Sequence, residues 1–209
     1  MARESTRDRI LRATLRILRE DGYRAAQIAP VAAAAGVAAG TVYLHFPSKS
    51  DLCAEVFRLA SAHEVAVLAE IGALPLPPAE RLESAVRTFV RRALRGPRLA
   101  YALIAEPVDP AVEAERIESK RAFARVFAGI LREGIERNEL PEQDVDAAAA
   151  CLIGALAESL VGPLTPESAR IETAGRERLE EALTAFCRRA VGLPATGADR
   201  DSKALRGVA

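Results

Sequence analysis

The chain is poor in the residues that most often carry chemistry. Its 209 residues include no tryptophan, one methionine, two histidines and three cysteines, and aromatic residues make up 4% of the total. The cysteines Cys53, Cys151 and Cys187 lie far apart and form neither a CxxC pair nor a Cys/His cluster. We therefore expect reduced cysteines that serve as small buried apolar residues, and no metal site.

The motifs of several enzyme classes are also missing. The two histidines, His45 and His63, have no Cys or Ser nearby in a nucleophile motif, and the sequence contains no HExxH and no phosphate loop. Neighbouring carboxylates such as Glu113 and Glu115 fit solvated helix faces. We predict that the chain is not an enzyme and uses no cofactor.

Long apolar runs are absent too. Residues 3–9 are charged where a signal peptide would be apolar, and no stretch reaches about 18 uncharged apolar residues. We therefore expect a cytoplasmic protein that does not associate with a membrane.

The whole chain has no excess of positive or negative charge, but the charged residues are unevenly distributed. Basic and acidic residues number 29 each. Residues 1–50 contain eight basic and four acidic side chains, so this part carries four excess positive charges and the remainder four negative ones. A basic head on an acidic body suits the binding of a polyanion.

Alanine, leucine, arginine and glutamate are what the sequence has in abundance, and half of all residues are apolar. Because β-branched runs are scarce, this composition predicts an all-α fold with a sizeable core. Helical periodicity, caps and Gly/Pro breaks predict about nine helices, at about residues 6–21, 27–34, 38–45, 49–71, 79–95, 101–106, 110–138, 144–161 and 165–191.

Residues 22–52 form the most informative stretch, because they predict two short helices around a tight turn. Ala32 and Ala35 are small enough for a close helix crossing, and Gly36 supplies a residue that can adopt a positive φ. Val37 and Val42 are spaced to hold the second helix against the first. This pattern is typical of a helix-turn-helix.

The outer face of the second helix is predicted to contact DNA. Thr41, Tyr43 and His45 can form hydrogen bonds with phosphates or with base edges. Ala38 and Ala39 can lie against a thymine methyl, while Gly40 leaves room for the sugar-phosphate backbone. The alternative is a plain buried helix end, with Tyr43 and Phe46 in the core and Lys49 a solvated cap; we expect burial for Val42 and Phe46.

This segment closely resembles the N-terminal helix-turn-helix of TetR-family transcriptional regulators. The matching residues are Gly22-Tyr23, Val31-Ala32, Ala35-Gly36-Val37, Gly40-Thr41-Val42-Tyr43, His45-Phe46, Ser48-Lys49 and Leu52. The resemblance implies a homodimeric repressor whose first three helices bind DNA and whose later helices enclose a ligand pocket and form the dimer. The DNA contacts that it implies fall on Gln27, Ala38, Ala39, Gly40, Thr41, Tyr43, His45 and Lys49.

The chain departs from the family pattern at three positions. Ala26 and Ala38 stand where the family usually has a hydroxyl residue, and Pro30 lacks an amide hydrogen. We therefore expect the second helix to start late or with a distorted first turn. Fewer hydroxyl donors also predict that specificity depends on Gln27, Thr41, apolar contacts and DNA shape.

We predict three parts: a DNA-binding domain over residues 1–50, a ligand-binding and dimerisation domain over 51–194, and a mobile tail over 195–209. Apolar and polar residues of the fourth to seventh helices are candidates for a ligand cavity: His63, Phe89, Tyr101, Ile104, Glu106, Phe123 and Phe127. The alternative for His63, Tyr101 and Glu106 is an ordinary core or surface position.

The last two helices are candidates for a dimer interface. Small residues on one and an apolar stripe on the other suit a four-helix seam, and the candidates are Cys151, Gly154, Ala155, Leu179, Leu183 and Phe186. The alternative is a purely intramolecular core. A dimer suits DNA reading, because two heads reach half-sites about 34 Å or more apart.

The function predicted from these features is a dimeric, sequence-specific regulator of transcription. Its partners would be a double-stranded operator with an inverted repeat, a second copy of the chain and a small hydrophobic effector that releases the DNA. Three alternatives stay open: a DNA-binding regulator without a small ligand, an activator in place of a repressor, and, as the least favoured, a helical enzyme.

Overall fold

The computed structural model describes residues 4–165 and 173–193. These residues form nine α-helices and one short 3-10 helix, with no strand among them: α1 Thr6–Glu20, η1 Tyr23–Ala25, α2 Ile28–Ala35, α3 Ala39–His45, α4 Lys49–Gly72, α5 Pro78–Arg95, α6 Pro97–Ile104, α7 Pro110–Glu136, α8 Val145–Leu164 and α9 Thr173–Ala190. The all-α prediction is confirmed. The predicted tail over residues 195–209 lies outside the described residues.

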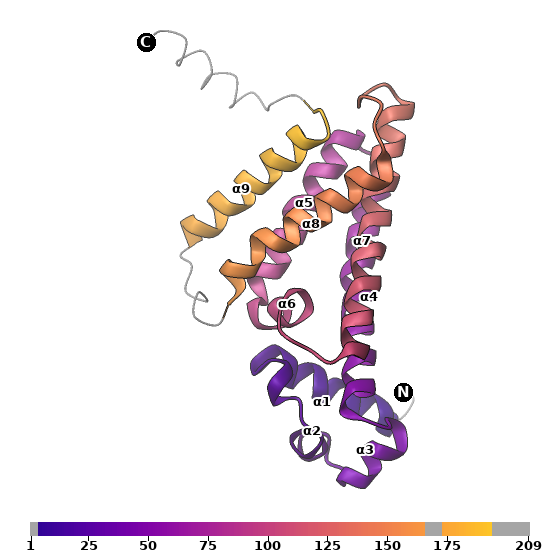
Figure 1. Cartoon of the computed structure of the whole chain (residues 1–209), viewed down its shortest axis with the longest axis vertical. Helices are drawn as coiled ribbons and strands as arrows, with labels where there is room; N and C mark the ends of the chain where they lie inside the picture. The colour runs from indigo at the N-terminus through magenta and orange to yellow at the C-terminus, as the bar shows by residue number, and fades with distance from the viewer. Residues whose placement is uncertain (1–3, 166–172, 194–209) are drawn as a thin grey trace.

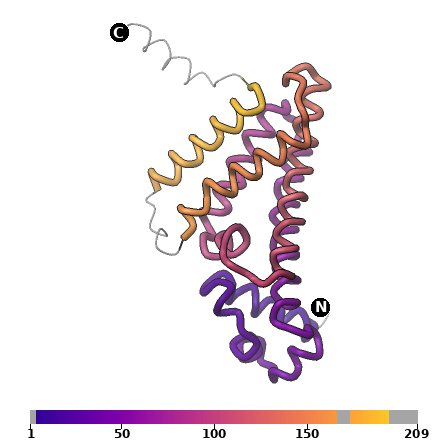
Figure 2. The backbone as a smooth tube through the Cα atoms, viewed as in Figure 1, coloured from indigo at the N-terminus to yellow at the C-terminus, as the bar shows by residue number. Residues whose placement is uncertain are grey.

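The molecule is elongated, with the first three helices at one end (Figure 1). The long helix α4 leaves this end and runs beside α7, with which it makes its most extensive contact. Helices α5, α8 and α9 complete the other end, and α6 lies between them and α1. The tube in Figure 2 follows the chain from α5 through α6 into α7 at this junction.

Side-chain caps start three of the helices at the predicted places. Ser5 accepts a hydrogen bond from the amide of Asp8 at 3.1 Å, and Ser48 accepts one from the amide of Asp51 at 3.1 Å. Asp144 caps α8 in the same way through the amide of Ala147 at 2.9 Å. Each cap satisfies an amide that has no partner within the helix.

The predicted late start of α2 is confirmed. Gln27 is the N-cap, with an extended backbone, so Pro30 is only the third helical residue. An amide at that position has no partner within the helix, and the missing hydrogen of proline therefore costs no hydrogen bond. Gly36 ends α2 in the left-handed conformation, with φ 66° and ψ 41°, and Val37 donates to the carbonyl of Ala32 at 3.0 Å.

Two helix boundaries differ from the prediction. Gly96-Pro97 was expected only to stop α5, but it also starts α6, because Gly96 caps both helices and Pro97 takes the first helical position. Gly162-Pro163 was expected to end α8, which continues to Leu164. A proline in the last turn removes a single helical hydrogen bond, and buried Leu160 and Leu164 hold that turn against the core.

The buried residues form two apolar clusters. The larger cluster is built from α4, α5, α7, α8 and α9, and the smaller from α1–α4 with Ala102 and Val112. Leu52 and Phe57 of α4 belong to the smaller cluster and Leu68 to the larger, so α4 is shared by both. The division at residue 50 therefore stays a prediction, because the smaller cluster extends beyond it.

Two cysteines serve as the small apolar residues that were expected. Cys53 and Cys187 are fully buried, and burial raises the pKa of their thiols to about 12 and about 11. Both therefore stay protonated at neutral pH. Cys151 is exposed, so the prediction of burial is wrong for this residue, and all three thiols are free.

By length and composition alone, helix α8 could cross a membrane. From the sequence, no stretch was expected to be long and apolar enough to do so. The α8 leucines Leu152, Leu156 and Leu160 are buried in the larger cluster. That packing is the usual reason why a core helix has such a composition.

Candidate nucleic-acid interface and ligand cavity

Helix α3 presents one face to the core and the opposite face to solvent. Val42 and the C-cap residue Phe46 are buried, at 0% and 4% exposure. On the other side Tyr43 is 53% exposed and Leu44 85% exposed, and His45 is also exposed. Because α3 lies at the free end of the molecule, this outer face is open to a large partner (Figure 1).

Residues next to α3 are more constrained than its outer face. Gln27 is exposed, and its side-chain amide donates to the carbonyl of Arg24 at 2.9 Å. The ammonium of Lys49 lies 4.1 Å from the ring centroid of Tyr23, which is a cation–π contact. The Tyr23 hydroxyl in turn donates to Asp109 at 2.5 Å. The side chain of Lys49, the first residue of α4, is thus held against the ring of Tyr23.

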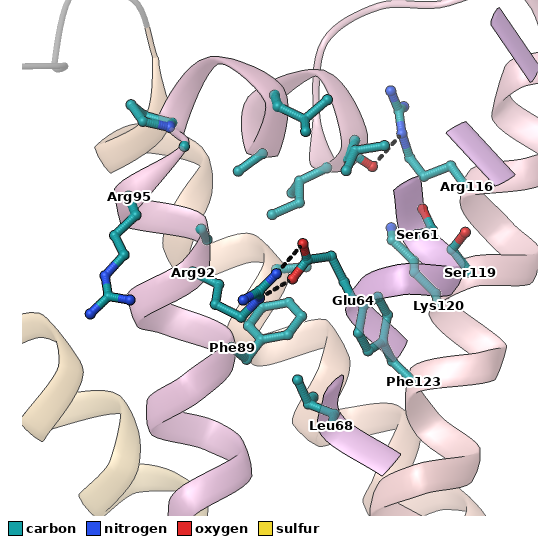
Figure 3. Close-up of a pocket in the computed structure, with 18 of the residues that line it drawn as sticks. Ser61, Glu64, Leu68, Phe89, Arg92, Arg95, Arg116, Ser119, Lys120 and Phe123 are labelled. Carbon is teal, nitrogen blue, oxygen red and sulfur yellow. Dashed lines mark hydrogen bonds and ion pairs between the residues drawn. The ribbon is translucent and has the colours of Figure 1, made fainter. Parts of the chain in front are cut away.

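A cavity of about 620 Å³ lies beneath α6, with walls from α4, α5, α7 and α8 (Figure 3). Its apolar wall is formed by Leu68, Phe89, Leu99, Leu103, Ile104, Phe123, Ile153 and Ala157. The rings of Phe89 and Phe123 meet edge to face with centroids 5.3 Å apart. A volume of this size falls within the usual range for small-molecule sites, about 300–1,000 Å³.

The charged residues of the cavity wall are mostly cationic. Six of them are basic, namely Arg19, Arg92, Arg95, Arg98, Arg116 and Lys120, whereas Glu64 is the one carboxylate. Glu64 and Arg92 point toward each other from α4 and α5 and form a two-bond ion pair, with one bond of 2.9 Å (Figure 3). This pairing with Glu64 raises the pKa of Arg92. The exposed residues Arg19, Arg95 and Lys120 place positive charge on the solvent side of the cavity.

The same junction holds the turn that leads into the helix-turn-helix. Arg98 donates to the carbonyl of Asp21 at 2.6 Å, and the buried carboxylate of Glu106 accepts from the amide of Tyr23 at 3.0 Å. Gly22 lies between them with φ 83°, and a Cβ there would come within 3.0 Å of both Arg98 and Glu106. We call the Arg98 and Glu106 contacts the turn clamp.

Arg116 of α7 fixes the far end of α6. Its guanidinium donates to the carbonyls of Ala102, Leu103 and Glu106, at 3.0, 3.1 and 2.7 Å. Burial lowers the pKa of Arg116, opposed by the nearby carboxylates of Glu113 and Glu106. Arg98 and Arg116 therefore belong both to the cavity wall and to the contacts that hold α6 and the turn before the helix-turn-helix.

Comparison with known proteins identifies the family. Residues 10–56 match the family described as bacterial regulatory proteins, tetR family, and residues 75–160 match the tetracyclin repressor-like C-terminal domain. The HTH-type transcriptional repressor KstR of Rhodococcus jostii is 31% identical over 182 residues, which cover 85% of this chain and 82% of that protein. The chain belongs to the TetR family.

Another relative is similar in sequence, and two solved structures are similar in fold. The fatty acid metabolism regulator protein of Bacillus subtilis is 26% identical over 154 residues, covering 72% of this chain and 79% of that protein. The structure of the fatty acid degradation regulator FadR from Bacillus halodurans matches with a TM-score of 0.73 at 23% identity, over 94% of this chain and all of that one. The FadR structure from Bacillus subtilis in complex with stearoyl-CoA gives 0.70 at 23% identity, over 85% and 97%.

As a TetR-family protein, the chain is a DNA-binding regulator of transcription, and α1–α3 are its DNA-binding helices. The structure groups most of the residues predicted to contact DNA on one surface. Ala38, Ala39, Gly40, Tyr43 and His45 are exposed, and Thr41 is half-buried. Their contacts with DNA stay a prediction. Gln27 and Lys49 lie beside this surface, each with a partner inside the protein.

The residues predicted for the ligand cavity separate into two groups. Phe89, Ile104 and Phe123 line the cavity. The other four lie outside its wall: Phe127 is fully buried in the larger cluster, Tyr101 packs against that cluster, His63 is exposed beside Arg92, and Glu106 holds the Tyr23 amide. We therefore keep only the first group as candidate ligand contacts.

The residues predicted for the dimer interface also differ in placement. Cys151, Gly154 and Phe186 are exposed, and Ala155 is half-buried. Leu183 is buried at 7% exposure, and Leu179 packs against the larger cluster, so both contribute to the core of one subunit. The exposed members remain candidates for contact with a second copy.

Sequence reasoning missed several residues of both sites. Leu44 was not among the residues predicted to contact DNA, although it is the most exposed large hydrophobic side chain of the described residues. Glu64, Arg92 and Arg98 were not selected for the cavity. The signal that could have found Glu64 and Arg92 is charge on the inward face of helices α4 and α5, where apolar residues are expected.

Proposed function

We propose that this TetR-family regulator is a cytoplasmic, homodimeric repressor that leaves its operator when an acyl-coenzyme A binds in the cavity. The observation that carries the proposal is a cavity with an apolar inner wall, a cationic solvent side and a direct connection to the DNA-binding helices through Arg98. An apolar acyl group suits the inner wall, and the phosphates of coenzyme A suit the cations.

The charges of the wall support an anionic ligand. Because Glu64 is already paired with Arg92, the remaining basic residues have little carboxylate to balance them within the cavity wall. Arg19, Arg95 and Lys120 are exposed and make no ion pair among the described residues. A ligand with several negative charges would gain charge-assisted hydrogen bonds there. The complex of Bacillus subtilis FadR with stearoyl-CoA supports the same class of ligand.

A dimer is supported by exposed surface on the last two helices. Phe186 of α9 is 46% exposed, and a Cβ added to Gly154 of α8 would meet no neighbouring atom within 4 Å, so another helix can approach closely there. Two DNA-binding ends related by a two-fold axis would read an inverted repeat.

Release of DNA would pass through the turn clamp. An anionic group that attracts Arg98 competes with the carbonyl of Asp21, and loss of that contact frees α1 and the helix-turn-helix to move relative to α6. The ligand shifts the population toward the state that binds it better. Turning an operator from 99:1 bound to 1:99 requires a preference of about 5.5 kcal/mol.

The proposal is tested with the duplex upstream of the protein's own gene and with operators selected from random duplexes, by fluorescence anisotropy at fixed salt. We expect sequence-specific binding that Tyr43→Ala weakens on the order of tenfold, the loss of a phosphate contact or two. Stearoyl-CoA should release the operator, whereas coenzyme A alone should not. Absence of specific binding, or release by neither stearoyl-CoA nor shorter acyl-CoAs, would contradict the proposal.

A further inference from the structure

The outer face of α3 contains none of the side chains that most often distinguish bases. The helix sequence Ala-Gly-Thr-Val-Tyr-Leu-His lacks Arg, Lys, Asn and Gln, which form the two-bond contacts with guanine or adenine. Gln27, the nearest amide side chain, is bonded to the carbonyl of Arg24. Direct reading of the major groove must therefore use other chemistry.

Leu44 is the most exposed large hydrophobic side chain of this face. Val42 and Phe46 are buried on the core side, and Leu44 lies between them in sequence, so its side chain points the opposite way and is 85% exposed. Gly40, one turn earlier, has no side chain, and a Cβ there would meet nothing within 4 Å. The space along the helix beside Leu44 is thus open to a partner.

The dimensions of α3 bring Leu44 to the bases. A seven-residue helix is about 10 Å long, and the major groove is about 12 Å wide, so the whole of α3 can lie within one groove. The groove carries one apolar group that a leucine can contact, the C5 methyl of thymine.

We propose that Leu44, together with Ala38 and Ala39 at the start of α3, recognises thymine methyl groups in each operator half-site. This inference rests on the proposed function, because it needs an operator. Leu44 is the specificity-determining residue, and its contact buries a methyl group against a side chain that is exposed in the free protein. Tyr43 and His45, which flank it on the same exposed side, are left for the sugar-phosphate backbone.

The test replaces single thymines of the selected operator with deoxyuridine, which removes only the C5 methyl and keeps base pairing. We expect one or two positions per half-site at which uracil weakens binding about fourfold, the change that burial of one methyl group gives. Leu44→Ala should bind thymine and uracil forms equally at one of these positions. When the same position carries cytosine instead of thymine, a 5-methyl group on that cytosine should improve the binding of the wild type.

Leu59→Ala is the matched control, because Leu59 is 42% exposed on α4 and does not belong to the exposed face of α3. It should retain the full uracil sensitivity. Uracil operators that all bind like the thymine form, or a Leu44→Ala variant that keeps the wild-type sensitivity, would overturn the inference while the proposed function stands. Failure to select any operator would overturn both.

Discussion

Gly40 combines poor helix propensity with a position on the exposed outer face of α3. It lies within α3, is exposed, and has open space where a Cβ would stand. Alanine would therefore suit the free protein better than glycine does, because glycine in a helix costs about 1 kcal/mol relative to alanine. The glycine is explained if a bound partner occupies the space of the missing side chain.

We predict that Gly40→Ala makes the free protein more stable and its operator complex weaker. The midpoint temperature of thermal unfolding should rise by about 2–4 °C, which is the shift for about 1 kcal/mol in a chain of this size. Operator binding should fall on the order of tenfold, since the added methyl must be accommodated against the DNA. Anisotropy and calorimetry measure the two effects.

Gly129→Ala supplies the control for this pair of measurements. Gly129 lies within α7, is exposed and also has nothing within 4 Å of a Cβ. It should give a similar rise in melting temperature with operator affinity unchanged. Equal operator affinity for Gly40→Ala and wild type would show that DNA does not come close to Gly40.

At the scale of elements, α6 connects the cavity to the DNA-binding helices. Arg98 lies in its first turn and bonds the carbonyl of Asp21, whereas Arg95, three residues earlier at the end of α5, lines the same cavity without a bond to that turn. Variants of the two arginines therefore distinguish binding of the ligand from transmission of its effect to the helix-turn-helix.

We predict that Arg98→Ala weakens operator binding without ligand by roughly tenfold, as expected for loss of one hydrogen bond to a charged group. Saturating stearoyl-CoA should then produce a smaller further loss than in the wild type. Arg95→Ala should lower the affinity for stearoyl-CoA but keep the wild-type loss at saturation. An Arg98→Ala variant with the wild-type response at saturation would exclude the turn clamp as the route.

Helices α5 and α9 are joined by charged groups in addition to apolar contacts. Glu180 of α9 is 9% exposed at its side chain and accepts bonds from Arg87 at 3.0 Å and Arg91 at 2.6 Å. Although burial acts to raise the pKa of Glu180, the bonds from the two arginines hold it below the usual value. A second acid, Glu83, bonds Arg87 and Arg188.

The lowered pKa of Glu180 predicts the pH dependence of its contribution. A carboxylate with a folded-state pKa below its unfolded value stabilises the fold above the ordinary pKa of about 4.3, and this stabilisation is lost as the pH falls through the lowered pKa. Glu180→Gln should therefore lower the free energy of unfolding by about 1–3 kcal/mol at pH 7. The difference from wild type should shrink as the pH falls below about 4.3.

Glu181→Gln is the adjacent control, since Glu181 is exposed. Urea unfolding at several pH values should show little change for it. A difference between wild type and Glu180→Gln that stays constant from pH 7 down to pH 3 would contradict the role given to this carboxylate.

Helices and their boundaries could be predicted from the sequence better than the tertiary contacts of each helix face. Caps and turns are local, so Ser5, Ser48 and Gly36 marked their boundaries correctly. Gly96-Pro97 was ambiguous because the same pair can end one helix and begin the next. Burial of Leu164 outweighed Pro163, which no local pattern could reveal.

The sites depend still more on tertiary contacts. Phe89, Phe123 and Phe127 look alike in sequence, yet Phe89 and Phe123 face the cavity and Phe127 fills the core. Helical spacing fixes which residues share a face, but the neighbouring helix decides whether that face is packed or open. The exposed face of α3 was more predictable, because the helix-turn-helix is a local unit.

At the scale of the whole molecule, the proposal requires two copies. Phe186→Asp on α9 should convert a dimer to monomers by placing a charge in the interface, and should reduce operator affinity by at least tenfold because the second head is lost. Light scattering and anisotropy measure the two effects.

Ile117→Asp on α7 is the matched control, because Ile117 is 45% exposed and Phe186 is 46% exposed. This variant should remain dimeric. A Phe186→Asp variant that stays dimeric would exclude this face.

If the cavity controls the DNA-binding helices, ligand binding and operator binding must be reciprocally linked. The dissociation constant of stearoyl-CoA is measured by calorimetry for the free protein and for its operator complex. We expect weaker binding to the complex, by the same factor by which saturating stearoyl-CoA weakens operator binding. Equal affinity for the free and DNA-bound protein would contradict the central claim that the cavity controls the DNA-binding helices.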